Sequence, residues 1–424
     1  MWFSVAKEKM TPDWPVLLGG FLSRTERHTG VFSDIYVKTL FLDDGSEQVL
    51  FVVLDLCMID NIFVARIKNR IIKKYGLVEA NILIHTTHIH SGPLTHMTHR
   101  ISEYKRADTQ KWMEHLEAKI MACVDKCMSS KEPGSIEIGN GETYIGVNRR
   151  VVTKSGVIFG ANYQAPIDRN LFVLKILNQD SKIKVILFNC ACHPVEMGSS
   201  LLLSSDYPGM ACNEIEKKIP GSIAIFMQGA CGEINNAITA RDSKHDTGVI
   251  ESKNTIVIGR VLANDVFNVI QRKMKKIKLS IRCKLDVLEL PLGENKIESI
   301  RELLESTMVN IRNYATWMID RYESGLIESG CRLYAGLIRL SDDVNLAVLE
   351  GEVCNGIGVN IKKVLLGNNT MVLGYSNGYI GYIPTSEIVR QGGYEARSLW
   401  MLFGYTAEFS EDIEKTILEY YRRI

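Results

Sequence analysis

Two histidines, His88 and His90, stand two residues apart at the end of a short apolar segment that begins at Asn81. They belong to a group of five histidines between His85 and His99, and a Ser-Gly-Pro turn follows them. Side chains two residues apart in an extended chain point to the same side. Imidazole nitrogen is a common ligand of divalent metals such as zinc. The pair therefore predicts a metal site, and two ordinary polar histidines in a loop are the alternative.

A second apolar run, residues 185–192, ends on a single histidine, His193. Burying an imidazole at the end of such a run costs free energy unless something binds it. A metal ion bound by both His88 and His193 would provide the buried imidazole of His193 with a partner. Turns at 204–209 and 229–236 follow, rich in small residues. Such turns expose backbone N–H groups and often line sites, although they also occur as plain connections.

Two familiar metal-hydrolase patterns do not fit these histidines. The metallo-β-lactamase pattern His-x-His-x-Asp-His would need Asp at Gly92 and His at Pro93. An amidohydrolase barrel needs two further strand-end histidines, and only His193 and His245 lie far enough along the chain. His245 stands in a polar stretch rather than at a strand end.

Strand-like and helix-like segments alternate along the chain and would position these side chains. Runs rich in Val, Ile, Leu and Phe predict strands at 34–42, 48–54, 81–85, 135–138, 172–177, 184–191 and 223–227. Amphipathic runs predict helices at 62–75, 108–128, 208–218, 255–275, 296–322 and 411–423. This alternation predicts an α/β fold with a mostly buried sheet and surrounding helices. Since no repeat or linker interrupts it, we expect a single domain over 1–424, with 284–346 as a helical insertion or cap.

The composition restricts the classes of binding partner and the cellular compartment that we expect for this protein. The 424 residues are 46% hydrophobic and 23% charged with a net charge of +1, which gives no basic excess for nucleic acid. The longest apolar run, Val49 to Ile59, is interrupted by Asp55 and is far shorter than the roughly 20 residues of a membrane-spanning helix. With no signal-peptide pattern at the N-terminus, we expect a cytoplasmic protein without integral membrane association. The ten cysteines, including Cys190 and Cys192 beside His193, are expected to be reduced and part of the core.

Several short segments resemble the neutral/alkaline ceramidases, zinc-dependent amidases that hydrolyse the N-acyl bond of ceramide. His88-Ile-His90-Ser-Gly-Pro resembles their His-Thr-His-Ser-Gly-Pro segment. Further matches follow in the family's order: Asn148-Arg149 with Asn-Arg-Ser, Cys192-His193-Pro194 with His-Ala-Thr, Leu349-Glu350-Gly351-Glu352 with Pro-Gly-Glu, Ser376-Asn377-Gly378-Tyr379-Ile380-Gly381-Tyr382 with Ser-Asn-x-Tyr-x-x-Tyr, and Gly393-Tyr394-Glu395 with Arg-Tyr-Glu. The resemblance extends from about Gly20 to Tyr394.

The resemblance implies a site and a fold. It implies one zinc ion per chain, held by His88, His193, Glu352 and Tyr382. It also implies that His90, Arg149 and Tyr394 act on the reacting carbonyl of the substrate, and that Gly20 and Asn235 bind the substrate. The implied fold is the α/β catalytic domain of the family. Because the chain ends soon after Tyr394, we expect no immunoglobulin-like C-terminal domain.

The sequence departs from the family at two positions. Asn235 stands where the ceramidases have an active-site serine, and an amide cannot serve as a hydroxyl nucleophile. This favours attack by a metal-activated water on a small soluble amide or ester rather than on ceramide. A zinc-containing binding protein that has lost turnover is the alternative. Glu350 replaces the proline of Pro-Gly-Glu and is an alternative to Glu352 as a metal ligand. The sequence does not distinguish zinc from another divalent metal. It also leaves the oligomeric state open, and a homo-oligomer is one of the possibilities.

Overall fold

The structure is a computed structural model of the whole chain. It describes residues 1–21, 24–95, 103–241, 252–307, 309–326, 330–366, 369–397 and 404–424. Three histidines weighed in the sequence, His96, His99 and His245, lie outside the described residues.

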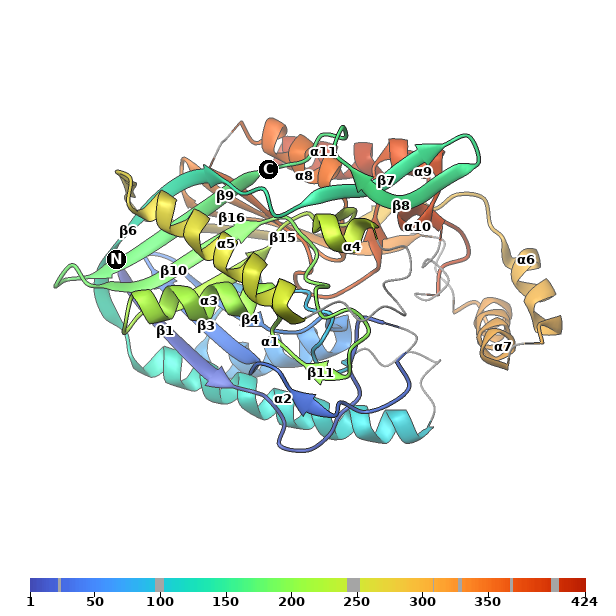
Figure 1. Cartoon of the computed structure of the whole chain (residues 1–424), viewed down its shortest axis with the longest axis horizontal. Coiled ribbons are helices and arrows are strands. Elements are labelled where there is room, and N and C mark those ends of the chain that lie inside the picture. Colours follow the sequence, from blue (N-terminus) through green and yellow to red (C-terminus); the bar gives the residue numbers. More distant parts are fainter. Residues whose placement is uncertain are drawn as a thin grey trace.

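A nine-stranded mixed sheet forms the centre of the molecule (Figure 1). Its hydrogen-bonded order is β12-β10-β9-β6-β1-β3-β4-β5, with β14 beside β6. Most neighbouring pairs are antiparallel, and β4–β5 and β10–β12 are parallel. The strands are β1 (Trp2–Lys9), β3 (Tyr36–Asp43), β4 (Gln48–Leu54), β5 (Ile82–Thr86), β6 (Glu132–Glu142), β9 (Asn170–Asn178), β10 (Ile183–Cys190), β12 (Ile223–Gln228) and β14 (Lys275–Ile277).

A second sheet packs against one face of the first. It runs β15-β16-β17-β19, with bounds β15 (Arg282–Leu290), β16 (Cys331–Ser341), β17 (Val344–Leu349) and β19 (Thr370–Leu373). Alternate residues of both sheets meet in one apolar cluster, in which Phe51 and Leu187 of the large sheet lie with Leu346 and Met371 of the small one. Two facing sheets bury the side chains that each strand directs inward.

Helices cover the outer faces of both sheets. The apolar stripes of α1 (Asn61–Tyr75) and α2 (Glu103–Ser129) pack on β3 and β4, and those of α3 (Asp206–Lys218) and α5 (Ser252–Ile270) pack on β9, β10 and β12. On the far side, α8 (Asn355–Val364) and α11 (Ile413–Arg423) cover the small sheet. The result is a helix–sheet–sheet–helix arrangement, and the predicted α/β fold with a buried sheet and surrounding helices is confirmed.

Helix α1 shows how the sequence sets an element's limits. The Asp60 carboxylate accepts a hydrogen bond of 2.8 Å from the backbone N–H of Phe63, which satisfies one of the free donors in the first turn. Gly76 ends the helix at φ 71°, a left-handed conformation that glycine adopts without a steric penalty. The helix therefore begins one residue before the predicted 62–75 and ends where predicted.

The region 284–346 is helical only in its middle. Helices α6 (Ile297–Glu302) and α7 (Val309–Glu323) have a small apolar cluster of their own and stand apart from the body in Figure 1. The flanking segments belong to β15 and β16 instead, because their alternate side chains complete the core between the sheets. The charged helix predicted at 296–322 is thus two shorter helices between two strands.

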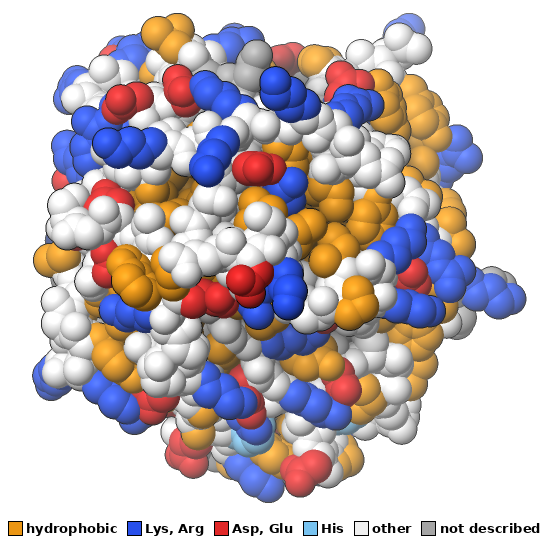
Figure 2. All heavy atoms as spheres, turned by 90° about the vertical axis from the view of Figure 1, so that its left-hand side faces the viewer, with side chains coloured by type: hydrophobic (Ala, Val, Ile, Leu, Met, Phe, Trp, Pro, Cys, Tyr) orange, Lys and Arg blue, Asp and Glu red, His pale blue; other side chains and the backbone are white. Residues whose placement is uncertain are grey.

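Short elements bring the loops of the site together. These are β2 (Gly30–Val31), β11 (Leu202–Leu203), β7 (Val147–Thr153), β8 (Gly156–Asn162), β13 (Ile234–Asn235), β18 (Glu352–Val353), β20 (Tyr382–Ile383), the 3₁₀ turns η1 (Glu79–Asn81) and η2 (Leu303–Glu305), and the helices α4 (Ala237–Arg241), α9 (Ser386–Gln391) and α10 (Tyr394–Arg397). Within the described ranges, no helix combines the length and the apolar character needed to cross a bilayer. On the face in Figure 2, acidic and basic side chains are interspersed.

Candidate metal and active site

The backbone at His88 is strained and fixed by its neighbours. His88 follows β5 and has φ 63°, which for a non-glycine residue costs about 1–3 kcal/mol. Its Nδ1 lies 2.8 Å from the carbonyl oxygen of Cys57, and its ring stacks on Tyr375 at a centroid distance of 3.9 Å. Since a carbonyl only accepts, Nδ1 carries a hydrogen, and Nε2 is the nitrogen that faces Glu352 and can bind a metal when it is deprotonated.

His193 is held in the same way from the other side. It follows β10, and its Nδ1 lies 2.8 Å from the carbonyl oxygen of Cys231. Its backbone N–H also donates to the carbonyl of Ile234 over 2.8 Å. Nε2 of His193, which faces Glu352, is therefore the nitrogen that can bind a metal. A backbone carbonyl on the far nitrogen is the usual orienting contact of a histidine that binds a metal.

Glu352 brings a carboxylate to the two histidines. Its Oε2 lies 3.1 Å from Nε2 of His193 and 3.3 Å from Nε2 of His88, and all three side chains are buried. Its Oε1 accepts a hydrogen bond from the Tyr379 hydroxyl. Strand β18 places Glu352 directly beside Tyr382 of β20 in a parallel pair.

The rival carboxylate, Glu350, has other contacts. Its Oε2 accepts the backbone N–H of Tyr334 over 2.9 Å, and burial raises its pKa to about 8. Among the residues described, it belongs to neither group of side chains that could hold a metal ion. The geometry therefore places Glu352, and not Glu350, at the histidines.

The charges in this cluster depend on one another. Burial works against a charge on His88, but the Glu352 carboxylate outweighs it and raises the pKa of His88 to about 10. Burial also works against a charge on Glu352, but His88 and His193 hold its pKa well below the usual range. Burial lowers the pKa of His193 to about 4. The cluster thus pairs a buried carboxylate with a cationic imidazole, and a divalent cation bound to deprotonated imidazoles would supply the same positive charge.

His90 lies at the edge of this cluster. Its Nε2 is 3.1 Å from Nε2 of His88, and its Nδ1 has no hydrogen-bond partner among the described residues. Gly20, with φ 91°, passes so close that a Cβ there would lie 2.7 Å from the His90 ring. Arg24 donates to the carbonyl of His90 over 2.5 Å. The predicted substrate-binding Gly20 is thus in direct contact with the predicted catalytic His90.

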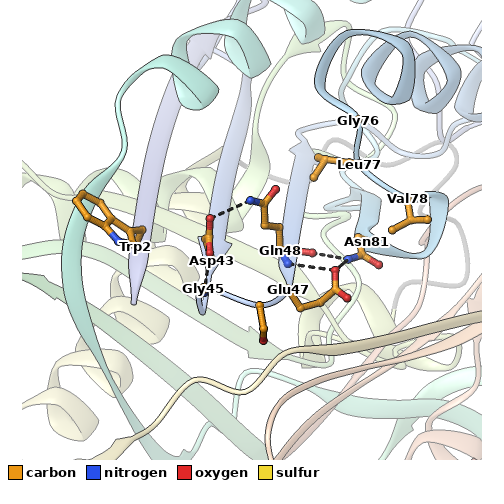
Figure 3. A pocket seen from close by; sticks show the side chains of 10 residues that line it. Trp2, Asp43, Gly45, Glu47, Gln48, Gly76, Leu77, Val78 and Asn81 are labelled. Carbon is orange, nitrogen blue, oxygen red and sulfur yellow. Dashed lines mark hydrogen bonds between the residues drawn. The ribbon is translucent and has the colours of Figure 1, made fainter.

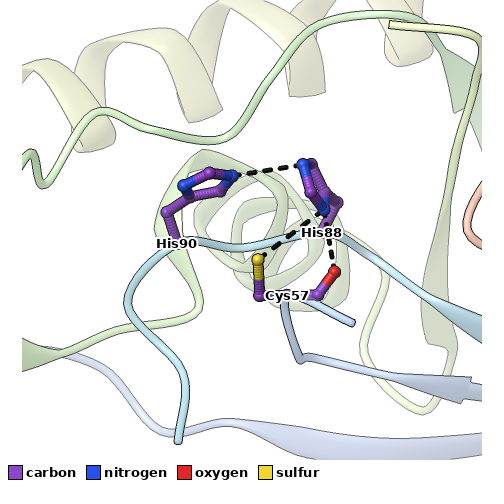
Figure 4. Close-up of side chains that lie close together, drawn as sticks. All are labelled: Cys57, His88 and His90. Carbon is purple, nitrogen blue, oxygen red and sulfur yellow. Dashed lines mark hydrogen bonds between the residues drawn. The ribbon is translucent and has the colours of Figure 1, made fainter. Parts of the chain in front are cut away.

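Cys57 forms a second group with His88 and His90 (Figure 4). Its Sγ lies 3.8 Å from Nδ1 of His88, the nitrogen that donates to the Cys57 carbonyl. A metal on the sulfur side would break that hydrogen bond, whereas Nε2 is free to bind on the side of Glu352 and His193. We therefore place the candidate metal centre among His88, His193 and Glu352.

Arg149 joins the remaining predicted residues. Its guanidinium donates to Oδ1 of Asn235, to the Tyr382 hydroxyl and to Oε1 of Glu395, at 3.0, 3.0 and 2.9 Å. Burial disfavours its charge, but Tyr382 and Glu395 hold the pKa of Arg149 above its usual range. The Tyr394 ring lies 5.5 Å from that of Tyr382 and is 36% exposed. The structure thus brings all nine predicted residues into two linked groups, and their roles stay predictions.

Three further residues were not singled out in the sequence. Tyr379 binds Glu352, Tyr375 stacks on His88, and Glu395 binds both Arg149 and Arg150, the latter over 2.5 Å. Tyr379 and Glu395 stand in the segments that resemble the ceramidases, which was the available signal. Tyr375 carries no sequence signal, since a tyrosine after an apolar strand is ordinary.

A cavity of about 330 Å³ lies at the other end of the large sheet (Figure 3). Its polar side chains bind one another: Gln48 donates to Asp43 over 2.9 Å, and Asn81 donates to Glu47 over 2.5 Å. Strand β4, seven residues or about 23 Å long, begins at this cavity, and Cys57 follows its other end. The cavity is therefore separate from the candidate metal centre.

Comparisons with known proteins identify the family and the fold. A sequence model of the family described as neutral/alkaline non-lysosomal ceramidase, N-terminal, matches residues 7–282. The fold is similar to that of a neutral ceramidase from Pseudomonas aeruginosa, with a TM-score of 0.75 at 15% identity over 99% of this chain and 73% of that one. It is equally similar to a ceramidase complexed with C2, with a TM-score of 0.75 at 15% identity over 99% of this chain and 74% of that one. With its ceramidase-like fold and sequence, the chain belongs to the neutral/alkaline non-lysosomal ceramidase family.

Proposed function

We propose that this protein is a zinc-dependent amidohydrolase, which cleaves a linear amide (or an ester) in a small soluble substrate. The observation that carries the proposal is the convergence of two imidazole nitrogens and one carboxylate oxygen, each oriented by a further hydrogen bond. Family membership supports hydrolase chemistry in general.

The spacing of the donor atoms suits zinc. Tetrahedral ligands at 2.0–2.1 Å from zinc lie about 3.3 Å from one another. The separations of 3.1 and 3.3 Å around Glu352 match this edge length. We propose His88, His193 and Glu352 as ligands of one zinc ion. Tyr382 is proposed as the fourth ligand on the resemblance to the ceramidases, and its backbone pairs with that of Glu352.

Roles for the surrounding residues follow from their hydrogen-bonding groups. When bound, zinc would polarise the substrate carbonyl and lower the pKa of a water to about 7. His90, with one ring nitrogen free of partners, can pass a proton to the leaving amine. The half-exposed Tyr394 can donate to the oxygen that gains negative charge. Arg149 holds Tyr382 in place and can contact the substrate or the carboxylate product.

A zinc-containing binding protein of the same fold is the second candidate. The observation that favours it is Asn235, which stands at the family's serine position and is bound to Arg149. A binding protein needs the same metal ligands but gains nothing from a proton donor at His90.

The test is elemental analysis of the purified protein beside a His193→Ala variant, followed by hydrolysis assays on linear amides and esters. We expect about one zinc per chain in the wild type, little in the variant, and zinc-dependent hydrolysis. Zinc without hydrolysis of any acyl compound would favour the binding protein. A wild-type protein that neither contains nor takes up zinc would overturn both candidates.

We also propose a cytoplasmic location. All ten cysteines are free thiols, and nine of them are buried. Reduced thiols at this number are typical of a reducing compartment.

A further inference from the structure

Asn235 presents a hydrogen-bond donor that nothing in the described structure uses. Its side chain is 1% exposed, and its Oδ1 lies 3.0 Å from Nη1 of Arg149. Since guanidinium nitrogens only donate, the atom that faces Arg149 must be the amide oxygen. The amide nitrogen Nδ2 therefore points elsewhere, and it has no hydrogen-bond partner among the described residues.

Arg149 holds the side-chain amide of Asn235 in this orientation and prevents its oxygen and nitrogen from exchanging places. Glu395 and Tyr382 hold the same guanidinium at 2.9 and 3.0 Å, so its third contact stays directed at Oδ1 of Asn235. A buried donor without a partner is rare in native proteins, because losing water without a replacement costs free energy. An acceptor other than the described residues, such as a water molecule or a group of a bound substrate, is then needed for Nδ2. Asn235 is itself joined through Arg149 to Tyr382, a proposed zinc ligand.

We infer that Asn235 is a specificity-determining residue, which selects substrates carrying an acceptor oxygen (a carboxylate or a carbonyl) next to the scissile amide and rejects those carrying an ammonium group. The inference rests on the proposed function, because it names the substrate class of that site. A serine, as at this position in the ceramidases, can donate or accept through its hydroxyl. Asn235 has its oxygen turned to Arg149, so the group that it directs away from Arg149 is the Nδ2 donor.

Net charge is not the source of this selection. Arg149 and Arg150 share Glu395, and the buried Glu233 lies near Arg150, so two cationic and two acidic groups surround the position. Substrates are distinguished by whether they can accept the hydrogen bond that Nδ2 of Asn235 donates. A neutral ester carbonyl should therefore be accepted as a carboxylate is, and an ammonium group should leave Nδ2 without a partner.

The test compares three N-acyl probes of equal chain length with zinc-loaded protein: N-acylglycine, its methyl ester, and N-acyl-ethylenediamine. The kcat/KM for amide cleavage is measured for wild type, Asn235→Ser and Asn235→Asp. We expect wild type to prefer both oxygen-bearing probes over the ammonium probe by at least tenfold. The preference should fall towards unity in Asn235→Ser and reverse in Asn235→Asp, whose carboxylate accepts from ammonium.

Two controls keep the outcome clear. Asn236→Ser changes the neighbouring amide, whose two atoms bind Ile145 and Ile238 within the chain, and should affect all probes equally. If Asn235→Asp does not fold, Asn235→Ser decides alone. Equilibrium binding of the probes to zinc-loaded His90→Ala protein separates recognition from turnover, so that absent hydrolysis counts against the proposed function only. An unchanged ratio in the Asn235 variants, or a wild type that prefers ammonium, overturns the inference.

Discussion

Nε2 of His193 lies 3.1 Å from Oε2 of Glu352, although 159 residues separate them in the chain. His193 follows a strand of the large sheet, and Glu352 follows the third strand of the small one. The contact therefore crosses the interface between the two sheets. The candidate metal centre forms only when these sheets pack together, which links metal affinity to folding.

Replacing Glu352 by Gln should abolish most of the zinc affinity. The change removes the only carboxylate of the proposed ligand set, and we expect a loss larger than the roughly 10–100-fold typical of outer residues around a zinc site. Glu350→Gln is the matched control, because burial raises the pKa of Glu350 to about 8 and an amide there conserves the charge at pH 7. Zinc titration of both variants measures the difference. Equal affinity in the two would contradict the ligand assignment.

Gly20→Ala should be more damaging than glycine strain alone explains. At φ 91° any side chain costs about 1–3 kcal/mol, and here the added Cβ would also lie 2.7 Å from the His90 ring. Gly45 has φ 95° with nothing within 4 Å, so Gly45→Ala carries the strain without the clash. Chemical denaturation and hydrolysis assays compare the two. We expect loss of activity only in Gly20→Ala, and similar activity in both would remove the link between Gly20 and His90.

His90→Ala should lower kcat by about 10²–10⁴-fold, the usual contribution of a positioned proton donor. The zinc content should remain near one per chain, since the three proposed nitrogen and carboxylate ligands are intact. Steady-state kinetics and elemental analysis on the same preparation give both values. Full activity in this variant would exclude the proposed role.

Glu395→Gln should destabilise the fold by about 3–5 kcal/mol, because it leaves two buried guanidiniums without their shared carboxylate. The control is Glu411→Gln, which breaks an exposed pair with Arg390 at 3.6 Å and should cost about 0–1 kcal/mol. Urea unfolding at pH 7 provides the free energies. A loss for Glu395→Gln no larger than that of the control would show that the network contributes little.

Stability should decrease in acid partly through His85. Burial lowers the pKa of His85 to about 3, and its two ring nitrogens are bound to Ser376 and to the backbone N–H of Gln228. The unfolded chain, with a pKa near 6.5, takes up this proton first, so stability is fully present above about pH 6.5. It is lost as the pH falls towards 3, by up to about 1.4 kcal/mol per pH unit.

The difference between wild type and His85→Gln isolates this contribution. Other histidines with lowered pKa values, such as His193, titrate in both proteins and cancel. Urea unfolding between pH 4 and 7 should show a shallower pH dependence for the variant. Parallel curves would assign the acid sensitivity to other groups.

The sequence by itself determined seven of the nine strands of the large sheet, all but β1 and β14, and the histidines that follow two of them. Apolar runs such as 48–54 and 223–227 have no other stable place than a buried sheet, so local pattern and tertiary position agree. His88 and His193 were visible because a polar side chain directly after such a run needs a partner. Of the nine expected site residues, His88, His90 and His193 follow from the residue pattern, and the other six, Glu352 and Tyr382 among them, follow from family resemblance alone.

The tertiary structure decided the rest. The small sheet was missed because β15 and β16 flank two charged helices. Their side chains are buried only by packing against the large sheet on one face and against α8 and α11 on the other. Glu350 and Glu352 have the same local pattern, and only the turn at Gly351, with φ 90°, directs one of them to the histidines. The choice of ligand, the contact of Gly20 with His90 and the free donor of Asn235 all depend on segments distant in sequence. No local preference encodes such contacts, because they form only when both sheets and their loops pack together.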